Sequence, residues 1–364
     1  MLKKIQNALI FRLNKSATLK NKLLQLMDLF YQYAPVFVGY FRRNPAYIKH
    51  VLNSKVIAKP GLFSYGAIFN PGALLANGEI LLLANAQKVP WFKAKGKNKD
   101  LYMQGNPLLM RLNQKSQKII DQNIITKIID LPQDQDYAIE DFRLFQWKDQ
   151  KMINHSLVIR NKIDDFINQS GSFSALSILD EIEKTFTFCA IPQVDFPLQD
   201  FEKNWVYKEN ENQLLLFYSV SPFKVLTLDH EKSFSFKTII DQHLSSKMND
   251  PGGFGTRVSF STNPIDYDEN HWLTVIHQIQ HRFTGRCYFH WAVLIDKTTF
   301  LPGKISSKPI FSGMGARGRV PGIRYISSIV KAENEILFFA GEGDIYVTVT
   351  KKTIKEIESL FVSL

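Results

Sequence analysis

The sequence has few cysteines and no long apolar run. Among its 364 residues only Cys189 and Cys287 are cysteines, and each lies inside an apolar segment. Two thiols provide neither a disulfide framework nor the spacing of a zinc site, so we expect buried thiols. No window of about 18 apolar residues occurs. Arg12, Asn14 and Lys15 interrupt the first apolar run too early for a secretory signal, so we expect a cytoplasmic protein.

Acidic residues are almost absent from the first 50 positions. Asp28 is the one acid there, against six lysines and three arginines, which gives this segment +8 of the net charge of +11. The remainder of the chain is nearly neutral, so the part beyond residue 50 has little of the excess positive charge that binds nucleic acid. We therefore expect no nucleic-acid partner.

The same segment has the pattern of a basic amphipathic helix. Apolar residues recur at helical spacing with cations between them: Leu2, Ile5, Leu9, Leu13, Leu19, Leu23, Leu26, Met27 and Phe30. Such a helix can lie on an anionic membrane surface, or it can pack its apolar stripe on the protein's own core. Pro35, Gly39 and Pro45 then interrupt the pattern. We predict an α-helical segment over residues 1–50 and a separate domain over residues 51–364.

Beyond residue 50 one β-rich unit recurs five times. Each unit has an apolar strand, a polar turn and a more apolar strand that ends on polar residues, with turns at 77–78, 148–149, 209–212, 266–270 and 332–335. The turns follow one another at intervals of roughly 60–70 residues, which suits a four-stranded blade with long loops. The pattern predicts an all-β fold, a five-bladed β-propeller.

Polar side chains follow the second strand of every unit. The pairs are Asn85 and Gln87, Asn154 and His155, Ser219 and Ser221, His277 and Gln278, and Glu342 and Asp344. Because the blades of a propeller surround one axis, polar residues at a common register would line a shared funnel. We place the candidate site there.

Four motifs occur in order between residues 60 and 360. They are "FNPGALLANGEILLLANA" (69–86), "IEDFR" (139–143), "WLTVIHQ" (272–278) and "LFFAGEGD" (337–344). They resemble the Asn-Pro-Gly-Ala turn, Glu-Asp-Pro-Arg, Trp-Leu…Tyr-His-Gly and Tyr-Gly-x-x-Asp motifs of glycoside hydrolase family 130, the five-bladed β-mannoside phosphorylases and hydrolases. The resemblance implies that Asp141 is the catalytic acid, which protonates the glycosidic oxygen by way of a sugar hydroxyl. It also implies that Asn70 and Asp344 hold the sugar and that His277 contacts an attacking phosphate.

The chemistry of glycoside cleavage agrees with an acid at this position. An inverting enzyme needs a proton donor on one side of the sugar and an activated nucleophile on the other. Burial and the neighbouring Glu140 would keep Asp141 protonated, whereas Arg143 would oppose protonation. The structural alternative is an ion pair between this acidic pair and Arg143 at a strand end.

The sequence departs from the family on the nucleophile side. Asn85 stands where the family has an arginine, and Phe142 stands where it has a proline. The stretches that correspond to the phosphate-binding arginines contain none, and Lys203 supplies only a monodentate charge. Phosphorolysis is therefore weakened relative to water or another acceptor. Arg257, at the end of a glycine-rich loop, could replace the missing charge, as could the arginines of "GMGARGRVPGIR" (313–324), although both loops could equally be solvated turns.

Three classes of function remain open. The first is an enzyme that cleaves a glycosidic bond with water, or weakly with phosphate. The second is a membrane-associated glycosyltransferase of surface-glycan synthesis that uses a nucleotide-sugar, and the third is a non-catalytic glycan-binding propeller. We expect a glycan partner, no metal ion and no cofactor. The expected substrate-binding residues are Asn70, Asn85, Glu140, Arg143, Lys203, Trp205, Arg257, His277 and Asp344, with Trp205 stacking on a sugar face.

Overall fold

The computed structural model describes residues 53–88, 105–129, 135–163, 166–199, 202–282, 285–314, 316–318 and 322–364. The helical segment expected over residues 1–50, and with it the proposed membrane contact, lies outside these residues. Within them the helices are short: α5 (Ser246–Asn249), α6 (Ile354–Glu358) and two 3-10 turns. None of the described helices has the length and apolarity needed to cross a membrane.

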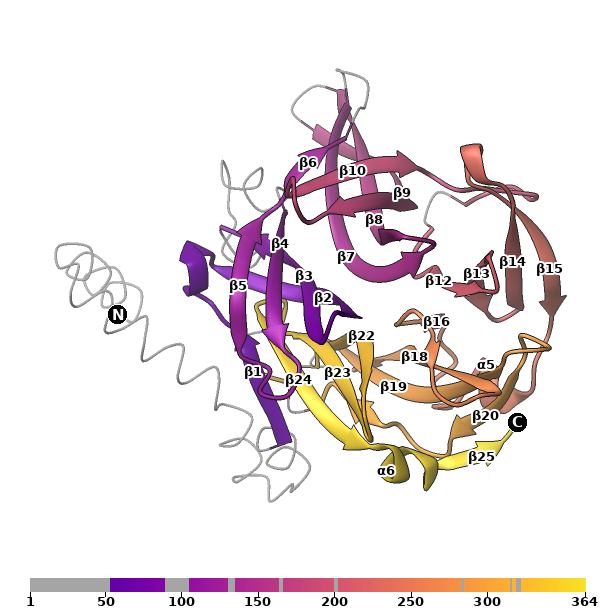
Figure 1. Ribbon diagram of the computed structural model, residues 1–364. Helices are drawn as coiled ribbons and strands as arrows, with labels where there is room; N and C mark the ends of the chain where they lie inside the picture. Colours follow the sequence, from indigo (N-terminus) through magenta and orange to yellow (C-terminus); the bar gives the residue numbers. More distant parts are fainter. Residues whose placement is uncertain are drawn as a thin grey trace, which may run out of the picture.

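The described strands form five sheets arranged around a central axis (Figure 1). The first sheet contains β2 (Ala67–Ala76), β3 (Glu79–Gln87), β4 (Asn106–Asn113) and β5 (Ile119–Ile124). The second contains β7 (Gln135–Trp147), β8 (Gln150–Ile163), β9 (Phe166–Asp180) and β10 (Thr185–Ala190), with β6 (Thr126–Ile128) at its outer edge. The third contains β12 (Val206–Asn210), β13 (Gln213–Val220), β14 (Phe223–His230), β15 (Ser235–Gln242) and β11 (Gln193–Val194).

The fourth sheet contains β16 (Val258–Phe260), β17 (Ile265–Asp266), β18 (His271–Arg282), β19 (Gly285–Asp296), β20 (Pro302–Ser306), β21 (Phe311–Ser312) and β25 (Phe361–Ser363). The fifth contains β22 (Arg324–Ala332), β23 (Glu335–Glu342), β24 (Tyr346–Thr353) and β1 (Ser54–Ala58). The strands nearest the axis are β2, β7, β12, β16 and β22, one from each sheet (Figure 1). The all-β propeller expected from the sequence is therefore confirmed.

The ring closes because strands from both ends of the described chain share the fifth sheet. β1 is the outermost strand there and pairs antiparallel with β24, with Ser54 opposite Thr350 and Val56 opposite Thr348. Closure of this kind pairs the outer edge of β24 and ties residues about 300 positions apart into one sheet.

Each hydrophobic core lies between two neighbouring sheets. One cluster joins Val206 and Phe217 of the third sheet to Trp272 and Trp291 of the fourth, and four similar clusters lie at the other junctions. Both faces of the middle strands are consequently buried, which explains apolar runs such as "ILLLA" in β3 instead of a strict alternation. The strongest hydrophobic segments of the sequence are these middle strands.

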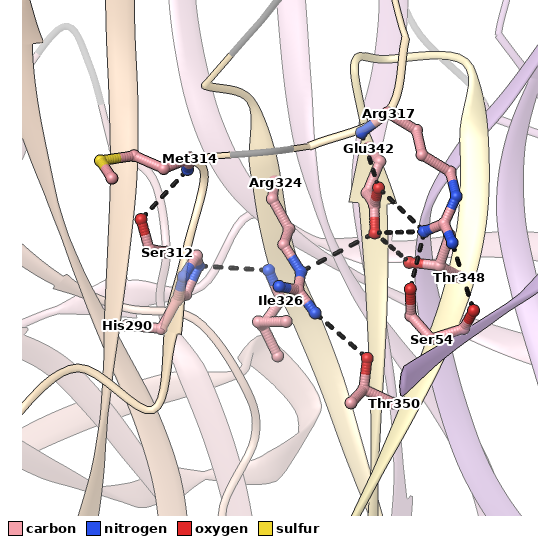
Figure 2. A network of polar contacts seen from close by, with 10 residues as sticks. All are labelled: Ser54, His290, Ser312, Met314, Arg317, Arg324, Ile326, Glu342, Thr348 and Thr350. Carbon is pink, nitrogen blue, oxygen red and sulfur yellow. Dashed lines mark hydrogen bonds and ion pairs between the residues drawn. The ribbon is translucent and has the colours of Figure 1, made fainter. Parts of the chain in front are cut away.

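A buried ion-pair network fastens the closing sheet (Figure 2). Arg317 Nη1 donates to Ser54 Oγ at 2.7 Å and lies 3.3 Å from Glu342 Oε2, while Arg324 Nε lies 3.8 Å from Glu342 Oε1. The side chains of both arginines are at most 3% exposed. This corrects the expectation that they would face a ligand or solvent. Arg319, the third arginine of that loop, lies outside the described residues.

Candidate active site

The inner strands bend where the site forms. Asn70 on β2, Asp141 on β7 and Asn204 just before β12 have left-handed backbone conformations, with φ of 47°, 59° and 67°. The strand register shifts at the first two of these positions. Asn and Asp adopt this conformation more readily than most residues, and such strained positions concentrate at functional sites. The bends place three polar residues from three sheets beside the axis.

Asp141 is held by Asn70. Asn70 Nδ2 donates to Asp141 Oδ1 at 2.7 Å, so the first and second sheets meet at this carboxylate. Asn70 Oδ1 is buried and finds no hydrogen-bond partner among the described residues. It lies against Gly341 of β23, where a Cβ would fall only 2.8 Å from Asn70 N and closer still to Oδ1. The orientation of Asp141 therefore depends on a close packing of three sheets.

Lys203 brings a positive charge to the same carboxylate. Its Nζ lies 2.8 Å from Glu140 Oε1, and both side chains are about one-third exposed. Burial lowers the pKa of Lys203, but the charges of Glu140 and Asp141 outweigh burial and raise the pKa overall. Lys203 thus remains protonated within range of the charge of Asp141.

Tyr288 of β19 lies between two carboxylates. Burial, followed by the charges of Asp141 and Asp344, raises the pKa of Tyr288 to about 12, so its phenol is neutral and can donate a hydrogen bond. Asp344 lies in the left-handed turn after β23, with φ of 54°. Tyr288 on the fourth sheet therefore lies within range of the charges of Asp141 on the second sheet and Asp344 on the fifth.

Arg143 fastens the inner strands beneath Asp141. Its Nε donates to Ser261 O at 2.7 Å, its Nη2 donates to Asn204 Oδ1 at 3.1 Å and to Tyr325 Oη, and its Nη1 donates to Asp141 O at 3.3 Å. The side chain is 2% exposed. These contacts link the second sheet to the third, fourth and fifth. The expectation that Arg143 binds substrate is corrected, because protein acceptors engage all three guanidinium nitrogens.

His277 lies beside this hub as a neutral imidazole. Its Nδ1 is 2.9 Å from Ser261 Oγ, and its ring centroid lies 5.7 Å from that of Tyr288 and 5.2 Å from that of Tyr325. Burial, and then the charge of Arg143, lowers the pKa of His277 to about 3. A neutral imidazole can contact a ligand as a hydrogen-bond donor or acceptor without adding charge.

Cations border this group on the third and fourth sheets. Arg257 is exposed just before β16, and its charge adds to the effects of burial and of Arg143 in lowering the pKa of His277. Arg286, exposed on β19, and Lys203 act on Tyr288 in the same sense. Three cations thus lie near the neutral His277 and Tyr288, an arrangement suited to an anionic group.

Two expected substrate contacts lie elsewhere. Trp205 is 1% exposed, its Nε1 donates to Glu202 Oε2 at 3.3 Å, and its ring packs against Tyr218 in the core between the second and third sheets. No face of its indole is open to a sugar, so that expectation is corrected. Asn85 is 2% exposed on β3 and packs against Gly105. Its burial argues against substrate contact as well.

The polar funnel was assigned to the wrong strands. The five polar pairs do occur on or next to equivalent strands, β3, β8, β13, β18 and β23, but these are second from the axis. His277 and Asp344 reach the site from there, whereas Asn154, His155 and Glu342 are buried within the blades. The site is lined mainly by the inner strands. Sequence reasoning missed Asn204, Tyr288, Tyr325 and Arg286, although Asn204 lies inside "EKNWVY", the stretch from which Lys203 and Trp205 were predicted as substrate contacts.

Comparisons with known proteins give structural matches alone. No protein-family model matches the sequence, and no curated protein matches it. Among solved structures, β-1,2-mannobiose phosphorylase from Listeria innocua, in complex with β-1,2-mannobiose, has a TM-score of 0.55 at 16% identity, over 85% of this chain and 93% of that one. The likeness is one of fold.

Two further solved structures share this fold. One comes from the GH130 family of mannoside phosphorylases, which contains glycoside hydrolases that target β-1,2 mannosidic linkages in Candida mannan. It has a TM-score of 0.58 at 12% identity, over 82% of this chain and 86% of that one. The other, MPT-1, is a GDP-Man-dependent mannosyltransferase from Leishmania mexicana, with a TM-score of 0.53 at 11% identity, over 82% and 88%. The propeller seen in GH130 proteins is thus the fold of this chain, in agreement with the resemblance of its motifs.

Proposed function

We propose that the protein is an enzyme that acts on the glycosidic bond of a β-mannoside-like glycan, with Asp141 as the proton donor. The observation that carries this proposal is the placement of Asp141 in a strained conformation at the axis, hydrogen-bonded to Asn70 at 2.7 Å. The neutral Tyr288 lies within range of the charges of both Asp141 and Asp344. The fold, shared with phosphorylases, hydrolases and a transferase of mannosides, supports a carbohydrate substrate.

The proposed reaction is a single displacement with inversion. Asp141 passes a proton, by way of a sugar hydroxyl, to the oxygen of the leaving group while the bond from that oxygen to the anomeric carbon breaks. The acceptor forms its bond to the same carbon from the opposite side and releases its own proton. Asn70 and Asp344 would hold the sugar, with the Lys203–Glu140 ion pair beside the acid.

Water and phosphate are the two acceptors for cleavage. The charges of Arg257 near His277, and of Arg286 and Lys203 near Tyr288, support an anionic acceptor, because charge-assisted hydrogen bonds to phosphate are stronger than neutral ones. Lys203 lies in one of the stretches that correspond to the family's phosphate-binding arginines, whereas Arg257 and Arg286 lie outside both. Phosphorolysis would therefore require a rearranged phosphate site, whereas hydrolysis would not.

Transfer from a nucleotide-sugar is the second candidate. The same cations could hold the phosphates of a donor, and MPT-1, a GDP-Man-dependent mannosyltransferase, shares the fold. Surface-glycan synthesis at the cytoplasmic side of a membrane would then give residues 1–50 a role. A non-catalytic glycan-binding propeller is the third candidate, and it predicts binding without turnover.

The test is a turnover screen of the wild type, Asp141→Asn and Asp149→Asn. β-Mannosides are offered with water or phosphate, and GDP-mannose and mannose 1-phosphate are offered with mannan acceptors. Asp149 lies exposed in the turn that follows the same strand, so its substitution is a matched control. We expect turnover to fall by about 10²–10⁴-fold in Asp141→Asn only, the usual effect of removing a general acid. Equal activity in Asp141→Asn and wild type would remove Asp141 from the mechanism, and the productive donor decides between cleavage and transfer.

A further inference from the structure

Gln278 occupies the position at which the Tyr-His-Gly motif has glycine. It follows His277 on β18, and its side chain is fully buried. A glycine has no side chain to contribute, so the contacts of Gln278 are a property of this chain. They all go to one loop, residues 250–256, which precedes β16.

The carboxamide of Gln278 crosses this loop. Gly252 N donates to Gln278 Oε1 at 3.0 Å, while Gln278 Nε2 donates to Asp250 Oδ1 at 2.5 Å and to Thr256 O at 2.9 Å. One side chain thus bonds to the first residue, the third and the last of the loop. Both polar atoms of the buried amide are engaged, which makes the arrangement costly to disturb.

Asp250 continues the network inside the loop. Its carboxylate accepts hydrogen bonds from Phe254 N at 2.9 Å and Gly255 N at 3.0 Å. Gly253 and Gly255 have φ of 64° and 63°, conformations that glycine adopts without strain, so the glycine-rich sequence allows this compact turn. Thr256 Oγ1 also donates to Ile279 O of β18 at 2.7 Å. The loop is therefore fixed to β18 at both of its ends.

Arg257 is the residue that this loop delivers to the site. It follows Thr256 directly, its side chain is exposed, and the next two residues, Val258 and Ser259, pair with Gln278 and His277 of β18. A long arginine side chain gains binding energy for a ligand only if its backbone is held in place. We propose that Gln278 is a positioning residue, which clamps the 250–256 loop so that Arg257 binds an anionic group beside His277. This inference rests on the proposed function, in which that site receives phosphate or the phosphate of a donor.

The first experiment measures the binding of inorganic phosphate in a double-mutant cycle. Wild type, Arg257→Ala, Gln278→Glu and the double variant are titrated by calorimetry. Glutamate has the shape of glutamine and can still accept from Gly252 N, but it presents a carboxylate to Asp250 and to Thr256 O. We expect either single substitution to weaken binding by about tenfold or more, the effect of losing one charge-assisted hydrogen bond. If Gln278 acts through Arg257, the double variant binds no more weakly than Arg257→Ala.

The second experiment follows the loop itself by amide hydrogen exchange. The amides of Phe254 and Gly255 should exchange faster in Gln278→Glu and at the wild-type rate in Arg257→Ala, because only the former breaks the clamp. Gln280→Glu, the same substitution two residues along β18, is the matched control and should leave both phosphate binding and exchange unchanged. Asp250→Asn, which alters the clamp from a partly exposed position, should reproduce the effects of Gln278→Glu and serves if that variant does not fold.

Three results would overturn the inference. They are wild-type phosphate affinity in Gln278→Glu and Asp250→Asn, additive losses in the double variant, and no difference in phosphate binding between wild type and Arg257→Ala. Neither measurement requires turnover. An active Asp141→Asn variant would therefore refute the proposed catalytic role while leaving a measured coupling of Gln278 and Arg257 intact, so the two failures are distinguishable.

Discussion

At the scale of single residues, the position of the proposed acid depends on a glycine. A Cβ at Gly341 would fall 2.8 Å from Asn70 N and closer still to Asn70 Oδ1, and Asn70 is the residue that holds Asp141. We predict that Gly341→Ala displaces Asn70, lowers turnover, and destabilises the protein by about 1–3 kcal/mol, the usual cost of overpacking a filled core. Urea denaturation and an assay on the substrate found for the wild type measure the two effects.

Gly303→Ala is the control for that substitution. Gly303 also lies in a strand, β20, and a Cβ there would have no atom within 4 Å. We expect its stability and turnover to match the wild type. If both alanine variants behave alike, the packing of Asn70 against β23 does not orient Asp141.

The same scale shows which site residues a sequence can reveal. Asn70, Asp141 and Asp344 lie in motifs, and all three are found at left-handed backbone positions near the axis. The structural role of Arg143 could not be predicted from the sequence, because three of its acceptors lie 61, 118 and 182 positions away along the chain. A short motif identifies a residue type at a bend, but it does not show which strands will cross beneath it.

At the scale of elements, the closing sheet depends on Arg317. This residue joins Ser54 of β1 to Glu342 of β23, and its side chain is 2% exposed. We predict that Arg317→Ala lowers the free energy of unfolding by about 3 kcal/mol, because one partner of a buried ion pair is removed and the other stays buried. Denaturation in urea, followed by tryptophan fluorescence, measures the change.

Arg111 provides the comparison for a surface pair. It lies 2.8 Å from Glu181 and 3.6 Å from Glu79, but its side chain is 40% exposed. Arg111→Ala should cost less than about 1 kcal/mol, since water screens such pairs. Equal losses in the two variants would contradict a special role for the buried network in closing the ring.

The repeating elements themselves were predictable from local pattern. The five expected turns all fall between an inner strand and its neighbour, for example Asn77 and Gly78 between β2 and β3. The outer strands were not predicted, because they are partly exposed and polar, as "IIDQNI" of β5 shows. The pairing of β1 with β24 was also missed, since no local signal reports a contact between the two ends of the domain.

At the scale of the whole molecule, buried histidines make stability depend on pH. Burial lowers the pKa of His155 to about 4 and that of His277 to about 3, and it also lowers that of His290. In the unfolded chain these groups titrate near their ordinary value of about 6.5. Between these values the unfolded state binds more protons than the folded state, so stability falls as pH falls below about 6.5. At pH 5 the cost is about 2 kcal/mol for each of His155 and His277.

We therefore predict a lower urea midpoint at pH 5 than at pH 7.5, and a smaller difference between the two in His155→Gln. Glutamine can still bond to Ser177 Oγ, which lies 3.0 Å from His155 Nε2, yet it takes up no proton on unfolding. Between pH 7.5 and pH 5 the free energy of unfolding of His155→Gln should therefore fall by about 2 kcal/mol less than that of the wild type. His243→Gln, on the exposed surface, should retain the full wild-type difference. A His155→Gln variant with that same full difference would show that His155 does not stay neutral inside the second sheet, and acid sensitivity would then have to come from elsewhere in the molecule.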